Sequence, residues 1–183
     1  EELRRFDDKY INDTGCSIFN NICGALNCEE REIVGIDVLK TGMTNNSFIF
    51  TCLKDSKKYV YRHPGKGTEA FISRKSEYFS MSVAKELGLD KSYVCMDESN
   101  GWKLSLYIED AHHLDYHNIS DLTKALGLIR RLHDANIKSE YPYRLWDQAN
   151  DFLDKIKAIG KDDTEDFYTL YERIHGLYRH TVN

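Results

Sequence analysis

The chain has 183 residues, of which 41% are hydrophobic and 30% charged, a composition typical of one globular domain or of a small lobe and the start of a second. Its formal net charge of -5 argues against sequence-independent binding to nucleic acid, because such binding needs a basic surface. No apolar run approaches the roughly 20 residues that cross a bilayer. The N-terminal sequence EELRRFDDKY is too polar for a signal peptide. We therefore expect a cytoplasmic protein with no membrane or nucleic-acid partner.

The N-terminal half of the chain shows one helical pattern followed by strand patterns. Apolar residues recur at helical spacing over 17–27, whereas apolar and polar residues alternate over 34–38, as in a half-buried strand. A second strand is predicted over 48–53 and a third over 58–63, joined by a short turn at 54–57. These short connections predict three consecutive antiparallel strands.

A second helix and two further strands follow. Thr68 is a residue type that caps helices, and the pattern predicts a helix from there to residue 87, ended by Gly88. Two more strands are predicted over 92–96 and 102–108. The predicted order up to about residue 108 is thus one helix, three strands, a second helix and two further strands.

The chain after residue 110 is helical in pattern, with Ser120 as the expected cap of the first helix. Two further helices carry apolar stripes over 145–156 and 167–177. The predicted fold is therefore α+β: a five-stranded antiparallel sheet with one helix, joined to the first helices of an α-helical lobe. That order of elements is the plan of the protein-kinase fold.

In a kinase fold, the turn between the first two strands covers the nucleotide phosphates, because its backbone N–H groups face the anion. Residues 41–47 occupy this turn, with Gly42 as the one glycine. A plain hairpin explains the same residues. The side chains that could contact phosphate are those of Thr44, Asn45, Asn46 and Ser47.

A kinase fold also needs a cation on the third strand and a carboxylate that holds the cation in place. Arg62 is the candidate cation, and the following helix offers Glu69 and Glu77 as partners. Glu77 lies well along the helix and is the favoured one. Either charge alone would be read as a solvated surface residue, and the pairing on adjacent elements is what points to a phosphate site.

The adenine ring of a bound nucleotide is expected at the end of the fifth strand, where backbone N–H and C=O groups make the hydrogen bonds. Tyr107, Ile108 and Glu109 occupy this position. An apolar strand end also fits a simple core position, and side chains cannot distinguish the two interpretations.

One motif has only a superficial likeness to a catalytic loop. A kinase loop needs H-x-D and an asparagine five residues after the aspartate, so that the base and a metal ligand converge. In 132–136 the sequence is LHDAN, with His133 and Asp134 adjacent and Asn136 two residues on. We interpret these residues as the end of an amphipathic helix, and we identify no catalytic residue and no metal ligand in the chain.

The remaining candidates for metal or redox chemistry are scattered. The five cysteines form no C-x-x-C pair, which favours reduced thiols over a zinc site. His112, His113 and His117 cluster without a matching ligand set and are interpreted as loop histidines.

The stretch from Leu39 to about His133 resembles the bacterial choline kinases that act in phosphorylcholine decoration of cell surfaces, members of the choline/ethanolamine kinase and aminoglycoside phosphotransferase superfamily. The matching words cover more than half of the chain in the family's order. They are GMTNNSF at 42–48, YVYRHPGKGTE at 59–69, ISRKSEYFSMSVAKELGL at 72–89, WKLSLYIED at 102–110 and IRRLHDANI at 129–137.

The resemblance implies roles for the residues already singled out. The Thr44-Asn45 turn would cover the ATP phosphates, Arg62 would replace the usual kinase lysine, and Glu77 would be its helix partner. The strand ending at Ile108 would lead into the hinge that holds adenine. The family usually has two glycines in the first turn, whereas this chain has threonine at the first of those positions.

The resemblance also implies residues that the chain does not show. The family's H-N-D or H-G-D loop, with an aspartate base and an asparagine that binds Mg²⁺, has no match after Asn136, so the Mg²⁺ ligands and the choline pocket are expected beyond residue 183. The start, ELRRFDDKY, resembles the tail of cytidylyltransferases that some bacteria fuse to choline kinases. The expected domains are an N-terminal helical segment at 1–32, a kinase-like ATP-binding lobe at 33–110 and a partial helical lobe at 111–183.

Three hypotheses follow. The leading one is the ATP-binding portion of a choline kinase, inactive alone, whose parent protein transfers phosphate from ATP to choline. The second is a natural non-catalytic binding or regulatory module. The third is part of a related ethanolamine or aminoglycoside kinase. The apolar stripe from Phe167 to Tyr178 has little left in the chain to bury it, which favours truncation or dimerisation.

Overall fold

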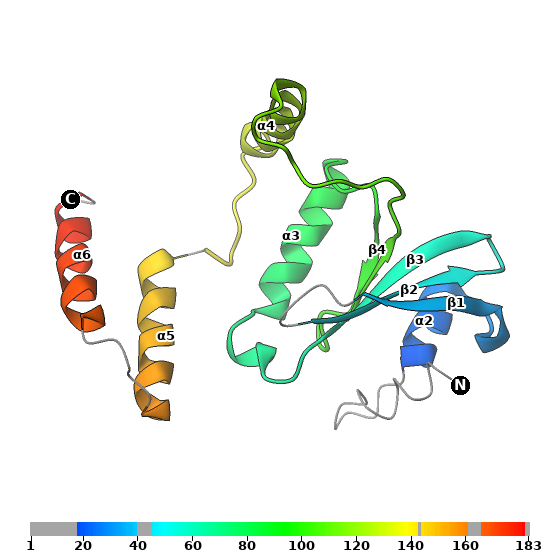
Figure 1. Ribbon diagram of the computed structural model, residues 1–183, viewed down its shortest axis with the longest axis horizontal. Coiled ribbons are helices and arrows are strands. Elements are labelled where there is room, and N and C mark those ends of the chain that lie inside the picture. Colours follow the sequence, from blue (N-terminus) through cyan, green and yellow to red (C-terminus); the bar gives the residue numbers. More distant parts are fainter. Residues whose placement is uncertain (1–17, 40–44, 143, 161–165, 182–183) are drawn as a thin grey trace. The chain divides into compact units, whose positions relative to one another are not determined.

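The computed structural model describes residues 18–39, 45–142, 144–160 and 166–181. These residues divide into two compact units, with the division between Ser139 and Glu140. The first unit holds a five-stranded sheet in the order β1-β2-β3-β5-β4, with every neighbouring pair antiparallel (Figure 1). Its strands are β1 (Ile33–Leu39), β2 (Asn45–Cys52), β3 (Lys57–Pro64), β4 (Tyr93–Met96) and β5 (Lys103–Leu106).

The structure confirms the predicted α+β class and the predicted succession of strands. A tight turn joins β2 and β3, where Ser56 has a φ of 58° and Asp55 Oδ1 accepts a hydrogen bond from the backbone N–H of Lys57 at 3.2 Å. This turn fixes the register in which Ser47 pairs with Arg62. Because strand side chains alternate between faces, the register decides which residues share a face.

One face of the sheet carries the hydrophobic core. Phe48 and Phe50 of β2, Tyr61 of β3 and Leu104 of β5 are at most 1% exposed. Helix α2 (Ile18–Leu26) covers this face and contributes Ile18 and Ile22. The rings of Phe48 and Tyr61 stack with centroids 5.3 Å apart, and Asn21 Nδ2 donates to the Tyr61 hydroxyl at 3.0 Å.

The predicted alternation of β1 is wrong at one point. Gly35 has a φ of 63°, and the register with β2 shifts between Val34 and Asp37, which is a bulge. Val34 therefore pairs with Thr51 and lies on the face opposite to Ile36, which packs against the core. Glycine adopts this positive φ without the steric penalty of a Cβ.

The helix predicted to begin at Thr68 begins six residues later. Thr68 opens a short 3-10 turn, η2 (Thr68–Ala70), and α3 (Arg74–Glu86) starts after Ser73, whose hydroxyl accepts a hydrogen bond from the backbone N–H of Ser76 at 3.3 Å. Thr68 instead donates its own hydroxyl to Gly65 O at 2.7 Å. Phe71 and Ile72, predicted as helical apolar positions, lie outside α3 and are 48% and 37% exposed.

Helix α4 (Ile119–Asp134) is capped by Asn118 and not by Ser120 as predicted. The Asn118 Oδ1 atom accepts from the backbone N–H groups of Ser120 and Asp121 at 2.9 and 3.4 Å. A short 3-10 turn, η1 (Glu30–Glu32), precedes β1. No helix in the described ranges is long and apolar enough to cross a membrane.

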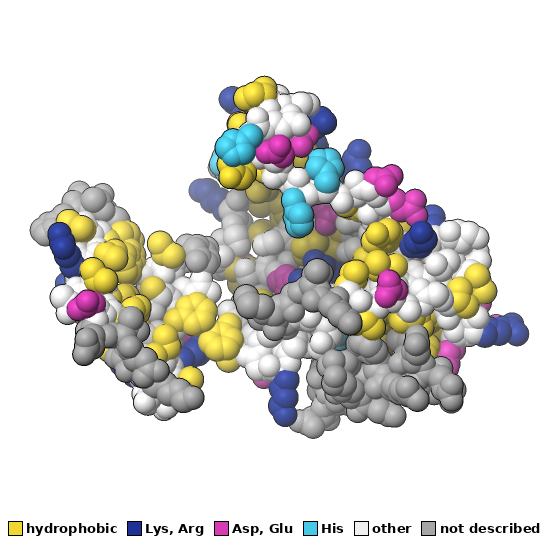
Figure 2. Space-filling view, in the orientation of Figure 1, with side chains coloured by type: hydrophobic (Ala, Val, Ile, Leu, Met, Phe, Trp, Pro, Cys, Tyr) yellow, Lys and Arg dark blue, Asp and Glu magenta, His cyan; other side chains and the backbone are white. Residues whose placement is uncertain are grey.

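The second unit consists of α5 (Leu145–Ile159) and α6 (Phe167–Thr181). Trp146 of α5 packs against Tyr171 and Tyr178 of α6, with ring centroids 5.8 and 5.0 Å apart. Hydrophobic side chains are nonetheless exposed on both helices (Figure 2), and Leu153 is the buried residue of α5. The domain bounds expected at residues 32 and 110 stay predictions.

Candidate functional site

The candidate site lies on the face of the sheet opposite to the aromatic core. Ser47, Arg62 and Lys103 stand directly opposite one another on β2, β3 and β5. Their neighbours Phe48, Tyr61 and Leu104 point into the core, so these three point to the other face. Polar side chains from three strands therefore meet in one row.

Helix α3 supplies the carboxylate to this row. Arg62 Nη2 donates to Glu77 Oε1, and the two side chains are only 23% and 19% exposed. Glu77 Oε2 also pairs with Arg74 Nη1 at 3.3 Å, and Arg74 Nη2 donates to Thr68 Oγ1 at 2.5 Å. Glu77 and not Glu69 is thus the partner of Arg62.

This ion pair fixes geometry more than it adds stability. Removing two charges from water offsets most of the attraction between them in a half-buried site. The pairing does hold the guanidinium of Arg62 in one orientation. Its Nε atom is buried and has no hydrogen-bond partner among the described residues, so one donor of the fork is unsatisfied.

The residues of the predicted phosphate turn do not all lie together. Asn45 and Ser47 have the same strand parity and share the face of Arg62, whereas Asn46 pairs with His63 and lies on the core side. The Oδ1 atom of Asn45 is buried and has no partner among the described residues. Thr44 lies outside the described residues.

An apolar strip continues the same face beside the polar row. Ile49 pairs with Val60, and Val60 pairs with Ser105, so the three form the next same-face row of the sheet. The bulge in β1 brings Val34, which is 37% exposed, to this face as well. A half-exposed apolar strip beside polar groups is the usual lining of a small-molecule site.

The predicted hinge residues follow β5 directly. The backbone N–H of Tyr107 donates a hydrogen bond to the carbonyl oxygen of Lys58 at 2.9 Å. Ile108 is 59% exposed, and within the described residues the backbone groups of Ile108 and Glu109 make no hydrogen bond to other backbone. Glu109 Oε1 accepts from Lys58 Nζ at 2.9 Å, and this bond lowers the pKa of Glu109 and raises that of Lys58.

The sequence interpretation missed Lys103. It considered only the end of this strand, at residues 107–109, although strand alternation places Lys103 on the side opposite to Leu104. Its nearest recorded polar contact is the sulfur of Met81, 3.9 Å from Nζ. Burial, followed by the neighbouring charge of Arg62, lowers the pKa of Lys103. The signal that could have found Lys103 is its position opposite Arg62 once the hairpin register is known.

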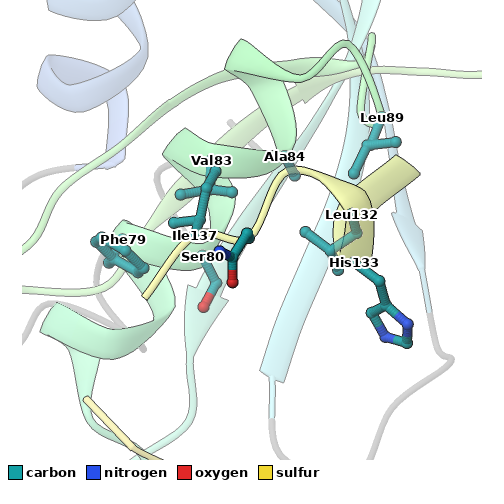
Figure 3. Close-up of a pocket in the computed structure, with 9 residues that line it drawn as sticks. Phe79, Ser80, Val83, Ala84, Leu89, Leu132, His133 and Ile137 are labelled. Atoms are coloured by element: carbon teal, nitrogen blue, oxygen red, sulfur yellow. The ribbon is translucent and has the colours of Figure 1, made fainter. Parts of the chain in front are cut away.

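The residues set aside in the sequence lie away from this row. His133 and Asn136 line an apolar pocket of about 460 Å³ between α3 and the end of α4 (Figure 3). Asp134 pairs instead with Arg130, at 3.4 Å. His112 lies in a loop, where its Nε2 atom is 3.3 Å from Asp121 Oδ2.

The thiols and metal candidates also lie outside the site. Within the described ranges, Cys23, Cys28, Cys52 and Cys95 are free, and no group of three or more His, Cys, Asp or Glu side chains could hold a metal ion. Burial raises the pKa of the Cys23, Cys28 and Cys95 thiols, that of Cys28 to about 12. Cys16 lies outside the described residues.

Comparison with known proteins found one relative by sequence and several similar solved structures. No protein-family model matches the chain. Protein LicA of Haemophilus influenzae is 23% identical over 119 residues, which are 63% of this chain and 34% of that protein.

Solved structures cover more of the chain. The crystal structure of choline kinase LicA from Streptococcus pneumoniae matches with a TM-score of 0.72 and 21% identity, over 90% of this chain and 56% of that one. A crystal structure of LicA in complex with AMP matches with a TM-score of 0.70 and 22% identity, again over 90% of this chain and 56% of that one. An ethanolamine kinase from Plasmodium vivax matches with a TM-score of 0.55 and 16% identity, over 90% of this chain and 50% of that one.

These matches show the fold. The chain has the protein-kinase-like fold found in choline and ethanolamine kinases, as its sequence predicted. It spans about half the length of these solved structures and about a third of the Haemophilus protein.

Proposed function

We propose that the α3-facing side of the sheet binds ATP. The observation that carries this proposal is the half-buried pair of Arg62 and Glu77, which holds a guanidinium with an unsatisfied Nε–H on that face. A phosphate oxygen is an acceptor that would satisfy this donor, and charge-assisted bonds to phosphate are among the stronger hydrogen bonds in proteins. Asn45 and Ser47 at the start of β2, with Thr44 just before them in the sequence, would contact the phosphates.

The base of the nucleotide would lie on the apolar strip. Ile49 and Val60 offer a flat half-exposed surface beside Arg62, and the backbone of Ile108 and Glu109 offers hydrogen-bonding groups at its end. This arrangement separates the apolar base from the charged phosphates, as the chemistry of a nucleotide requires. The complex of LicA with AMP supports the proposal, because that protein shares the fold.

For the whole protein we propose a choline-kinase-like phosphotransferase, in which ATP phosphorylates choline or a similar small amino alcohol to supply phosphocholine for cell-surface decoration. The similarity to LicA in sequence and fold supports this reaction class. The chain spans about half the length of the solved LicA structures. This supports the proposal that this chain binds the nucleotide and that a further part of the protein carries out phosphoryl transfer. Fusion to a cytidylyltransferase stays a prediction from the first residues.

Mg²⁺ would screen the phosphate charges in such a reaction. As the resemblance to choline kinases implies, the Mg²⁺ ligands and the catalytic base are expected beyond residue 183. The expected result is a protein that binds ATP weakly and does not transfer phosphate by itself.

The proposal is tested by titrating the 183-residue chain with ATP in a calorimeter, beside Arg62→Met and the matched control Lys57→Met. Lys57 is an exposed lysine at the far end of the same strand. We expect binding by the wild type and by Lys57→Met, and about a tenfold or greater loss in Arg62→Met, because a charge-assisted hydrogen bond is worth about 1.5–3 kcal/mol. Equal affinities in all three proteins would contradict the proposed site.

A coupled assay with ATP, Mg²⁺ and each of choline, ethanolamine and an aminoglycoside separates the whole-protein hypotheses. The ethanolamine arm is included because an ethanolamine kinase shares the fold. Turnover with any acceptor would contradict the assignment of transfer to another part of the protein. Light scattering in the same buffer tests the predicted dimer of the exposed α6 stripe.

A further inference from the structure

Lys103 is a charged side chain for which the described residues provide no counter-ion at ion-pair distance. It stands on β5 directly opposite Arg62 and is half-buried. Among the described residues no carboxylate lies within 4.0 Å of its Nζ atom, and its recorded contact is the weak acceptor sulfur of Met81 at 3.9 Å. A half-buried ammonium normally finds a stronger partner.

The position of Lys103 is also unfavourable for folding alone. Like charges directly opposite on neighbouring strands repel each other, and Arg62 occupies the opposite position. Glu77 could compensate, but its two oxygens already pair with Arg62 and Arg74. The row therefore contains more positive charge than the nearby carboxylate neutralises.

The other acidic group that affects Lys103 is also engaged. Asp90 Oδ1 accepts hydrogen bonds from the backbone N–H and hydroxyl of Ser92 at 2.8 and 2.7 Å, and from the backbone N–H of Tyr93 at 3.2 Å. These bonds outweigh burial and lower the pKa of Asp90. Asp90 thus holds the loop before β4 and is not a dedicated partner for Lys103.

We propose that Lys103 is a second phosphate-binding cation, which together with Arg62 clamps the polyphosphate of a nucleoside di- or triphosphate. The inference rests on the proposed ATP site and adds a residue and a ligand preference to it. Because the two residues stand opposite each other on neighbouring strands, one anion on this face would interact with both positive charges.

The two cations have different freedom, and this difference gives each a role. The guanidinium of Arg62 is fixed by Glu77, so it sets where the first phosphate lies. The ammonium of Lys103 has no carboxylate at ion-pair distance among the described residues and sits on a flexible four-carbon chain, so it can follow a second phosphate. Nucleotides with several phosphates should therefore depend on Lys103 more than adenosine, which has none.

The clamp also predicts how binding responds to pH. The groups that face Lys103 are Arg62 from β3, Glu77 from α3 and Asp90 from the loop before β4. Phosphate binds the protonated amine, so affinity is present below the pKa of Lys103 and falls as pH rises through it. Because that pKa lies below the usual lysine range, the fall begins at a lower pH than an ordinary lysine would give.

The test compares ATP and adenosine binding to the wild type, Lys103→Met, Lys103→Arg and the control Lys57→Met by calorimetry. Methionine keeps the length of the side chain and removes its charge. We expect Lys103→Met to bind ATP about tenfold more weakly and adenosine equally, since one charge-assisted contact is lost. Lys103→Arg should restore most of the affinity, and the fall of affinity with pH should disappear in Lys103→Met.

The outcomes separate the clamp from the site on which it rests. Wild-type affinity in Lys103→Met, together with weak binding by Arg62→Met, would overturn the clamp and leave the ATP site standing. No ATP binding by the wild type would overturn both. If Lys103→Met weakened the affinities for ATP and adenosine equally, Lys103 would have a structural role, and this result would also overturn the clamp.

A labelling experiment on the wild type keeps the clamp testable if Lys103→Met does not fold. N-hydroxysuccinimidyl acetate acetylates accessible amines, and mass spectrometry quantifies acetylation at Lys103 and at Lys57. We expect ATP to protect Lys103 at least severalfold, adenosine to protect it little, and Lys57 to be unaffected. Equal acetylation of Lys103 with and without ATP would overturn the clamp.

Discussion

The two faces of the sheet divide stability and binding between neighbouring residues of the same strands. Phe48, Tyr61 and Leu104 on one face are almost completely buried against α2, whereas Ser47, Arg62 and Lys103, each next to one of them in sequence, face the α3 side. The core face is mainly apolar and filled, whereas the α3 side holds charges, an unsatisfied donor at Arg62 Nε and an unsatisfied acceptor at Asn45 Oδ1.

This contrast teaches that a single substitution should affect either folding or binding, according to the parity of its position. Burial of a large side chain contributes about 1.5–3 kcal/mol to folding, whereas a half-exposed ion pair contributes much less. The predictions below use neighbouring residues of opposite parity as each other's controls.

The largest effect is expected in the core. Phe48→Ala should lower the free energy of unfolding by about 3–5 kcal/mol, because it leaves a cavity under a fully buried ring. The neighbouring Ile49→Ala faces the other side and should cost about 1–2 kcal/mol. Urea denaturation measures the free energy of unfolding of both variants. A larger loss of stability in Ile49→Ala than in Phe48→Ala would contradict the assignment of these residues to the two faces.

A smaller effect is expected at Gly101, which lies between β4 and β5 and against the side chain of Arg74 in α3. Gly101 has a φ of 75°, and a Cβ there would lie 2.5 Å from Arg74 Cδ. Gly101→Ala should lower stability by about 1–3 kcal/mol through backbone strain and should displace Arg74 from Glu77.

Gly127 in α4 is the matched control, because beyond its chain neighbours and the backbone of its own helix no atom lies within 4 Å of the position that its Cβ would take. Gly127→Ala should raise stability by up to about 1 kcal/mol, since alanine is the better helix former. Thermal unfolding of both variants measures the contrast. Similar shifts in the same direction would contradict the role of Arg74 and of the positive φ.

The smallest effect concerns the exposed pair at the end of β5. The hydrogen bond and charge of Lys58 lower the pKa of Glu109, so the charged carboxylate is favoured in the folded protein. The resulting stabilisation is present above the unfolded pKa and is lost as pH falls through the lower folded pKa. In a carboxylate NMR titration, Lys58→Met should return the Glu109 pKa to its usual range, and an unchanged midpoint would exclude this pair.

The sequence predicted the strands and the Arg62–Glu77 pair, because alternation and the order of elements are local signals. It failed where several residues compete for one role. Thr68 and Ser73 are both capping residues, and Phe71 and Ile72 continue the apolar period between them, so the pattern alone placed the helix start too early.

Long-range register explains the other failures. The bulge at Gly35 and the position of Lys103 opposite Arg62 are set by pairing with strands elsewhere in the chain, which a single-strand pattern does not contain. Asn46 was grouped with Asn45 and Ser47 for the same reason, since a turn motif does not show on which strand residue the alternation begins. The roles proposed for all these residues in nucleotide binding stay predictions.

Methyl NMR of the wild-type chain during an ATP titration tests the central claim most directly, because it reports each face of the sheet separately. The methyl groups of Ile49 and Val60 lie on the α3 side, and those of Ile22 and Leu104 lie in the core. The account predicts that ATP shifts the signals of Ile49 and Val60 and leaves those of Ile22 and Leu104 nearly unchanged. Shifts confined to Val83 and Leu132 in the pocket between α3 and α4, or no shifts at all, would contradict it.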